Sequence, residues 1–136
     1  MLEKIMIETP SDENLINITA EVKEIVKTSG VKEGACVVYI PHTTAGLTIN
    51  YIMDPATLAD LQQEIKRLVP TRVDFEHIYD TPADAAGHIK SSLVGPSLSL
   101  IITDGELFLG RSQGILFWEF DGPRKRQIHI RILRDE

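Results

Sequence analysis

The sequence of 136 residues has little of several features that mark particular classes of protein. Its one cysteine, Cys36, excludes an internal disulfide and a thiolate metal site, and its apolar neighbours predict an inert, buried thiol. There are 14 Lys and Arg against 20 Asp and Glu, a net charge of −6, which argues against nucleic acid as the main partner. No apolar run approaches the ~20 residues that cross a bilayer, and the N-terminus lacks the apolar region of a signal peptide. We therefore expect a cytoplasmic protein that binds neither nucleic acid nor a membrane.

The sequence also lacks the motifs of several large enzyme classes. It has no GxxxxGK[ST] phosphate loop, no GxGxxG after a predicted strand and no GxSxG elbow. These absences disfavour P-loop nucleotide hydrolysis, dinucleotide binding and α/β-hydrolase chemistry. What is present is an ordinary globular composition, with 43% hydrophobic and 25% charged residues. The length fits one domain, so we predict a single compact domain over residues 1–136.

Hydrophobic periodicity predicts an α+β fold, mostly antiparallel β-sheet or sandwich, with two or three helices. The first two strands, separated by turn-forming residues around Pro10, are expected to pair, and Thr19 is expected to cap the first helix. The apolar run 34–40 is rich in β-branched residues and predicts a buried central strand. The predicted strands are 5–8, 14–18, 34–40, 43–50, 97–103, 106–109, 114–120 and 127–133, and the predicted helices are 19–29, 55–69 and 83–93.

Three of the four histidines lie where a site could form. His42 follows the predicted central strand, His77 lies in an acidic loop, and His88 lies on a short helix rich in small residues. Three neutral imidazoles from separate elements would make an open metal site with a fourth position for water or substrate. The spacing matches no metal motif, so three unrelated histidines with local hydrogen bonds remain the alternative. The fourth, His129, lies on the polar face of the last strand and is expected at the surface.

Charged and polar residues near the C-terminus form a second candidate region. Residues 119–126 carry two acids followed by three bases, which predicts either a salt-bridged turn or an anion clamp built on Arg124, whose planar fork matches phosphate. Lys90, two residues after His88, could add a positive charge. Gln113 lies in a glycine-flanked segment that suits the close approach of a ligand.

Several blocks of this sequence, spread over nearly the whole chain, form a recognisable set. The blocks are HTTAGLTIN at 42–50, DP at 54–55, FEH at 75–77, DTPADAAGHIK at 80–90, GELFLG at 105–110 and EFDGPR at 119–124. Together they resemble the YjbQ family of secondary thiamine-phosphate synthase-like proteins. The resemblance implies a small α+β domain that assembles as a homotrimer, with the site near subunit contacts. It also implies that His42, His77 and His88 converge on a divalent, zinc-like metal.

The resemblance further implies a reaction on a small phosphorylated metabolite. The activity ascribed to the family joins a pyrimidine diphosphate to a thiazole phosphate and releases pyrophosphate, which requires charge neutralisation and positioning. On this interpretation the metal and Arg124, with Lys90, hold the phosphates, while Asn50 and Gln113 orient the substrate. The candidates for a catalytic base are Asp54, Glu76 and Glu119.

The chain departs from the family pattern at a few positions. Tyr51 stands where the family usually has Glu, Arg111 and Ser112 replace a common Thr-Trp pair, and Asp84 replaces an Asn near the helical histidine. A missing acidic residue next to Asn50 would remove a ligand or a base. A non-catalytic trimer that binds a metal or an anion is therefore the alternative to an enzyme.

Overall fold

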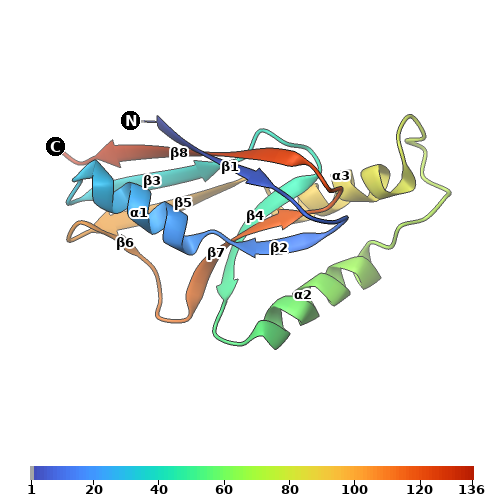
Figure 1. Cartoon of the computed structure of the whole chain (residues 1–136), viewed down its shortest axis with the longest axis horizontal. Coiled ribbons are helices and arrows are strands. Elements are labelled where there is room, and N and C mark those ends of the chain that lie inside the picture. Colours follow the sequence, from blue (N-terminus) through green and yellow to red (C-terminus); the bar gives the residue numbers. More distant parts are fainter. Residues whose placement is uncertain (1) are drawn as a thin grey trace.

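The computed structural model describes residues 2–136, which form three helices and eight strands (Figure 1). The helices are α1 (Thr19–Ser29), α2 (Pro55–Leu68) and α3 (Pro82–Val94). The strands are β1 (Leu2–Glu8), β2 (Asn14–Asn17), β3 (Gly34–Tyr39), β4 (Ala45–Tyr51), β5 (Ser97–Thr103), β6 (Glu106–Phe108), β7 (Gln113–Glu119) and β8 (Lys125–Arg134). The element types agree with the hydrophobic pattern, and the bounds differ by a few residues.

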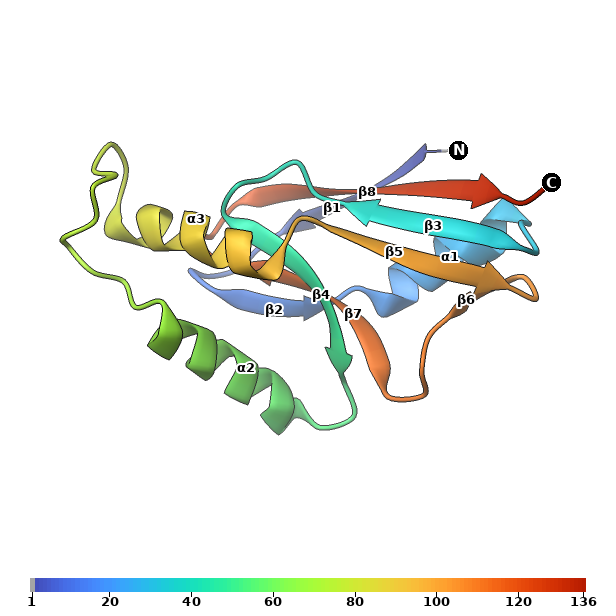
Figure 2. The ribbon, with the colours of Figure 1, turned by 180° about the vertical axis from the view of Figure 1, so that it is seen from behind.

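The strands form two antiparallel sheets, which confirms the predicted α+β class. The five-stranded sheet has the order β1-β8-β3-β5-β6, and the three-stranded sheet has the order β2-β7-β4. Helix α1 and the smaller sheet lie against one face of the larger sheet, while α2 and α3 extend toward the far end of the molecule (Figures 1 and 2). One continuous apolar core joins α1 with both sheets.

The predicted central strand is confirmed, although only one of its faces is buried. Strand β3 lies between β8 and β5. Cys36 and Val38 are fully buried, whereas Tyr39 faces outward. Because the outer face of the larger sheet is not covered, the apolar run alternates between core and surface. Burial raises the pKa of the Cys36 thiol to about 11, as expected for an inert cysteine.

The predicted pairing of the first two strands is wrong. Strand β1 pairs with β8, and β2 pairs with β7, so these neighbours in sequence belong to different sheets. The segment between them crosses from one sheet to the other and is bonded to the β7–β8 turn. Thr9 N donates to Arg124 O at 2.8 Å, and Gly122 N donates to Asp12 O at 2.9 Å. These bonds satisfy backbone groups that a local hairpin would otherwise have paired.

The helix ends follow the expected signals at all but one position. Gly30 ends α1 with φ 72°, and Asp54 caps α2 by accepting a hydrogen bond from Ala56 N at 2.9 Å. Thr19 is the first residue of α1 rather than its cap. Its N–H donates to Asn17 Oδ1 at 3.0 Å, and its hydroxyl accepts from the buried N–H of Ile115 at 2.9 Å. Ile18 occupies the N-cap position without a side-chain cap bond, and Asn17, one residue earlier, accepts the N–H of Thr19.

Helix α2 differs from the other helices because none of its residues is buried. It runs along the edge of the molecule and leads into an irregular segment, residues 69–81, that returns to α3 (Figure 2). Within residues 2–136, no helix combines the length and the apolar character needed to cross a membrane.

Candidate functional site

Helix α3 begins with local signals that place two site residues on one face. The hydroxyl of Thr81 accepts a hydrogen bond from Asp84 N at 3.1 Å, and Pro82 occupies the first turn. Asp84 and His88 are four residues apart, so their side chains project from the same face of the helix. The irregular segment before α3 brings His77 to that face.

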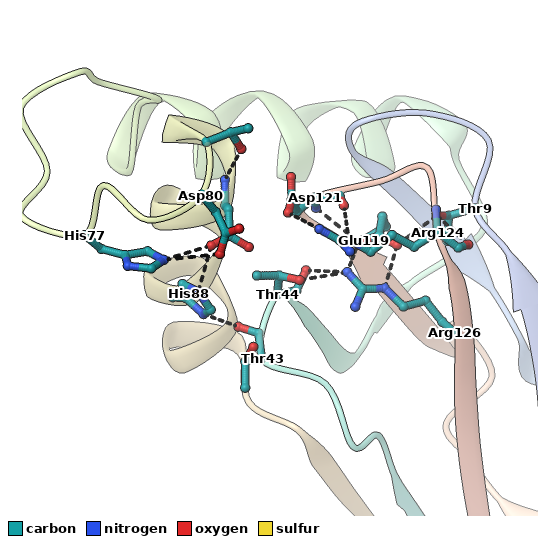
Figure 3. Close-up of polar contacts among 12 residues, drawn as sticks. Thr9, Thr43, Thr44, His77, Asp80, His88, Glu119, Asp121, Arg124 and Arg126 are labelled. Carbon is teal, nitrogen blue, oxygen red and sulfur yellow. Dashed lines mark hydrogen bonds and ion pairs between the residues drawn. The ribbon is translucent and has the colours of Figure 1, made fainter.

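The three side chains meet at one carboxylate oxygen. His77 Nε2 and His88 Nε2 each lie 3.0 Å from Asp84 Oδ2 (Figure 3). The two imidazole rings are 5.2 Å apart in an edge-on arrangement. The three ligand atoms lie within 4.8 Å of one another. We call His77, Asp84 and His88 the His–Asp cluster.

The orientation of His88 follows from its second nitrogen. Nδ1 lies 3.2 Å from the carbonyl oxygen of Thr43. Because a carbonyl only accepts hydrogen bonds, Nδ1 carries the proton. In the neutral ring the lone pair of Nε2 then points at the carboxylate of Asp84, so two acceptors face each other. A proton or a cation between them resolves this conflict, and two imidazoles with a carboxylate are a common ligand set for a divalent ion.

The cluster is open to solvent on one side. The side chains of His77 and His88 are 41% and 39% exposed, whereas that of Asp84 is 10% exposed. A structural zinc site is closed by four protein ligands, while a site with three leaves a position for water or substrate. A cleft of about 210 Å³ adjoins His77, and the Arg72 guanidinium lies 4.6 Å above the Phe75 ring. The cleft is lined by Arg72, Val73, Phe75, His77, Ile78, Asp80 and Pro82.

His42, predicted as the third imidazole ligand, lies outside the His–Asp cluster. Its Nε2 accepts a hydrogen bond from the backbone N–H of Gln127 at 2.9 Å. Burial lowers the pKa of His42, and the neighbouring Arg126 adds to this. Asp84 takes the third place in the cluster. The spacing of four residues between Asp84 and His88 indicates this carboxylate in the sequence, whereas the positions of the histidines alone do not.

Arg124 lies next to the cluster through Asp121. Its Nε donates to Asp121 O at 2.7 Å and its Nη2 to Asp121 Oδ2 at 2.8 Å, while half of the Arg124 side chain is exposed. The carboxyl groups of Asp121 and Asp84 lie close enough to affect each other's pKa. Burial raises the pKa of Asp121, and the Asp84 carboxylate raises it further against the opposing effect of Arg124. Acidic and basic groups therefore continue from the cluster to Arg124.

Glu119, predicted as a catalytic base, belongs to a separate buried network. It forms an ion pair with Arg126, and both side chains are almost inaccessible. Its two oxygens accept hydrogen bonds from Thr9 Oγ1 at 2.8 Å, Arg126 Nε at 2.8 Å and Asp121 N at 3.1 Å. Although burial alone raises a carboxyl pKa, the bonds from Arg126, Asp121 and Thr9 outweigh it and lower the pKa of Glu119. We call Thr9, Thr44, Glu119 and Arg126 the Glu119–Arg126 network.

Three other predicted residues lie at the opposite end of the smaller sheet. Asn50 faces Gly114 across β4 and β7, whereas Ala45 faces Glu119 at the end near the cluster. Five residues of strand separate Asn50 from Ala45, which is about 17 Å. The side chains at that far end make local backbone contacts: Asn50 Oδ1 with Tyr51 N at 2.7 Å, Gln113 Oε1 with Gly110 N at 2.7 Å and Asp54 Oδ1 with Ala56 N at 2.9 Å. The structure does not bring them to the His–Asp cluster.

Lys90 points away from the cluster as well. Its Nζ forms an ion pair with Glu13, and the two side chains are 3% and 8% exposed. The pair lines a cleft of about 370 Å³ between the irregular segment and α3, on the other face of the helix from His88. Lys90 is thus neutralised by Glu13 rather than free to bind an anion beside His88.

Comparison with known proteins places this site in a family. A model described as "UPF0047 protein YjbQ-like" matches residues 3–135, which include the cluster and the buried network. The chain belongs to the YjbQ/UPF0047 family. Among its relatives in that family are a UPF0047 protein of Methanocaldococcus jannaschii, 43% identical over 100% of this chain and 96% of that protein, and YugU of Bacillus subtilis, 40% identical over 98% and 99%.

Solved structures share the fold. An uncharacterised member from Clostridium acetobutylicum superposes with a TM-score of 0.90 at 41% identity, covering 96% of this chain and 99% of that one. A hypothetical protein from Aeropyrum pernix gives a TM-score of 0.93 at 30% identity, covering 99% of both chains. The family resemblance inferred from the sequence and the two-sheet fold are thereby confirmed.

Proposed function

We propose that this protein binds a divalent, zinc-like metal ion through His77, Asp84 and His88, and uses it to hold a small phosphorylated metabolite in the cytoplasm. The convergence of two imidazole nitrogens on one carboxylate oxygen, each at 3.0 Å, is the observation that carries the proposal. The donor set fits a borderline ion such as zinc better than an oxygen-preferring ion such as magnesium.

Arg124 is the proposed anion-binding residue of the same site. A guanidinium has five N–H groups. Asp121 accepts hydrogen bonds from two of those of Arg124, one at Nε and one at Nη2, so three remain for phosphate oxygens. The cleft beside His77 adds the Arg72 guanidinium and the Phe75 ring, which suit the charged and the flat part of a metabolite.

The reaction we propose is transfer from a diphosphate ester, with thiamine-phosphate formation as the candidate. A bound divalent ion would offset the charge that develops on the leaving pyrophosphate. Arg124 would bind that group, and Asp121 would hold Arg124 in place.

A non-catalytic metal- and anion-binding protein is the second candidate. It is favoured by the distance of Asn50, Asp54 and Gln113 from the cluster, because binding needs only the cluster and Arg124. The two candidates are separated by measuring pyrophosphate release from the two thiamine precursors with zinc-loaded protein. Release that is lost in His88→Ala supports the enzyme, and equal rates in both proteins support binding alone.

Metal binding itself is tested by elemental analysis and by titration with Zn²⁺ and Co²⁺. We expect one ion per chain in the wild type and none in Asp84→Ala or His88→Ala. A wild type that takes up neither ion would overturn the proposal. Retention of the fold in both variants is checked by circular dichroism, because the cluster lies outside the apolar core.

A homotrimer is part of the same proposal. A ring of three requires two different complementary patches on each chain, because its contacts are head-to-tail. Exposed apolar side chains gather at opposite ends of the long axis: one group on β5, β6 and β8, the other on the segment before α3 (Figure 1). The first group is Ile101, Phe108 and Leu133, and the second is Val73, Ile78 and Tyr79. Sedimentation equilibrium with Phe108→Lys and Tyr79→Lys tests both patches, and each variant alone should give monomers.

A further inference from the structure

Two residues of the loop between β3 and β4, His42 and Thr44, form hydrogen bonds with two consecutive residues of β8. Gln127 N donates to His42 Nε2 at 2.9 Å. One residue earlier on the strand, Arg126 Nη2 donates to Thr44 Oγ1 at 2.8 Å and to Thr44 O at 3.3 Å. Thr43 lies between these two attachments.

The β8 side of these contacts is rigid. Arg126 is held by Glu119, and Glu119 by Thr9, so one strand from each sheet and the segment that follows β1 contribute to one buried network. The side chains of Arg126 and Glu119 are 6% and 0% exposed. A hydrogen-bonded ion pair without access to water has few alternative arrangements, because each would leave a buried charge unpaired.

Helix α3 packs directly on the same loop. A Cβ on Gly87 would lie 3.2 Å from Thr44 Cγ2, so the helix approaches this loop closely where it has no side chain. One turn later, Ser91 Oγ donates to Ala45 O at 2.6 Å. The helix backbone is therefore fixed relative to Thr43, whose carbonyl accepts the Nδ1 proton of His88 at 3.2 Å (Figure 3).

We propose that His42 and Arg126 are positioning residues that clamp the loop and present the Thr43 carbonyl to His88. The clamp fixes which nitrogen of His88 carries the proton and turns Nε2 toward Asp84. This inference rests on the proposed metal site and gives His42 a new role in it: His42 accepts a backbone hydrogen bond and is not a metal ligand. Partners that orient metal-binding histidines in this way are typically worth about 10–100-fold in metal affinity.

The two possible roles of His42 are distinguished by a conservative variant. In His42→Gln, the side-chain oxygen lies as many bonds from Cβ as Nε2 does and can accept the Gln127 N–H, but an amide is a poor zinc ligand. His42→Ala removes the acceptor altogether. Thr44→Val and Thr44→Ser form a second matched pair, since valine keeps the shape without the hydroxyl and serine keeps the hydroxyl.

The experiment is titration of full-length protein with Zn²⁺ and Co²⁺, with unfolding of the metal-free proteins measured alongside. We expect affinity to fall about 10–100-fold in His42→Ala, to fall in Thr44→Val, and to stay near wild type in His42→Gln and Thr44→Ser. If His42→Gln loses as much affinity as His42→Ala, His42 is a ligand and the clamp is wrong. Wild-type affinity in His42→Ala also overturns it.

A second readout needs no metal. In chelated, ¹⁵N-labelled protein, the Nδ1 proton of His88 should give a slowly exchanging signal that survives in His42→Gln and disappears in His42→Ala. The signal unchanged in His42→Ala would overturn the clamp. Failure of the proposed function is a separate result: the wild type then binds neither ion, while the Nδ1 signal of His88 in the chelated proteins still decides whether the clamp exists.

Discussion

Two polar clusters lie on either side of Thr44 and use similar side chains in opposite ways. The Glu119–Arg126 network is buried and balanced, with a donor for each carboxylate oxygen. The His–Asp cluster is half-exposed and unbalanced, because two imidazoles and a second carboxyl surround Asp84. The first arrangement is complete within the chain, whereas the second leaves two imidazole nitrogens and a carboxylate oxygen side by side at a surface open to solvent. We infer that stability resides in the first cluster and ligand binding in the second.

The largest expected effect is a loss of stability when the buried Glu119–Arg126 network is broken. Arg126→Ala leaves Glu119 charged and without its partner in the interior, which should cost about 3–5 kcal/mol of unfolding free energy. Urea denaturation measures it. Lys125→Ala is the matched control on the same strand, because its pair with Glu8 is 3.9 Å long and exposed, and it should cost less than about 1 kcal/mol. Equal losses of unfolding free energy in Arg126→Ala and Lys125→Ala would contradict the contrast between the buried network and an exposed ion pair.

Substitutions in the His–Asp cluster should change stability mainly by removing the stabilisation that bound zinc provides. At zinc concentrations of about 100 times the dissociation constant, binding stabilises the folded state by about 2.7 kcal/mol. Asp84→Asn should abolish this gain, since it removes the carboxylate on which the two imidazoles converge. Asp80→Asn is the control, because Asp80 Oδ2 is 3.8 Å from His77 Nε2 and half-exposed. Thermal unfolding with zinc and with chelator checks the prediction, and a zinc shift that persists in Asp84→Asn would refute it.

Truncating Arg124 should weaken anion binding and leave stability nearly unchanged. The Arg124–Asp121 pair is half-exposed, so Arg124→Ala should cost less than about 1 kcal/mol of folding free energy. Charge-assisted hydrogen bonds to phosphate contribute about 1.5–3 kcal/mol, so phosphate affinity should fall about 10-fold or more. Calorimetric titration with inorganic phosphate measures it. Arg111→Ala, at the far end of the smaller sheet, is the control and should bind as wild type does.

The sequence predicted the elements better than their partners. Alternation of apolar residues gave the strands, because it records which face each residue buries. The pairing partners of β1 and β2 could not be predicted, since the paired residues lie 99 to 129 positions later in the chain. At the site, residue type indicated His77 and His88, and helical spacing could have added Asp84. The partner of His42 is a backbone N–H 85 residues later, which no local pattern indicates.

The smallest expected effect is a dependence of stability on pH through His42. Burial holds the pKa of His42 below its ordinary value of 6.5. As the pH falls through 6.5, the unfolded chain takes up a proton that the folded chain refuses, so this contribution to stability is present above pH 6.5 and is lost below it. His42→Gln lacks this titration, so the wild type should lose unfolding free energy relative to the variant as the pH falls from 8 to 5.5. Parallel profiles across this range would mean that His42 is as free to protonate as a surface histidine, and a freely protonated ring could not accept the Gln127 N–H that clamps the loop.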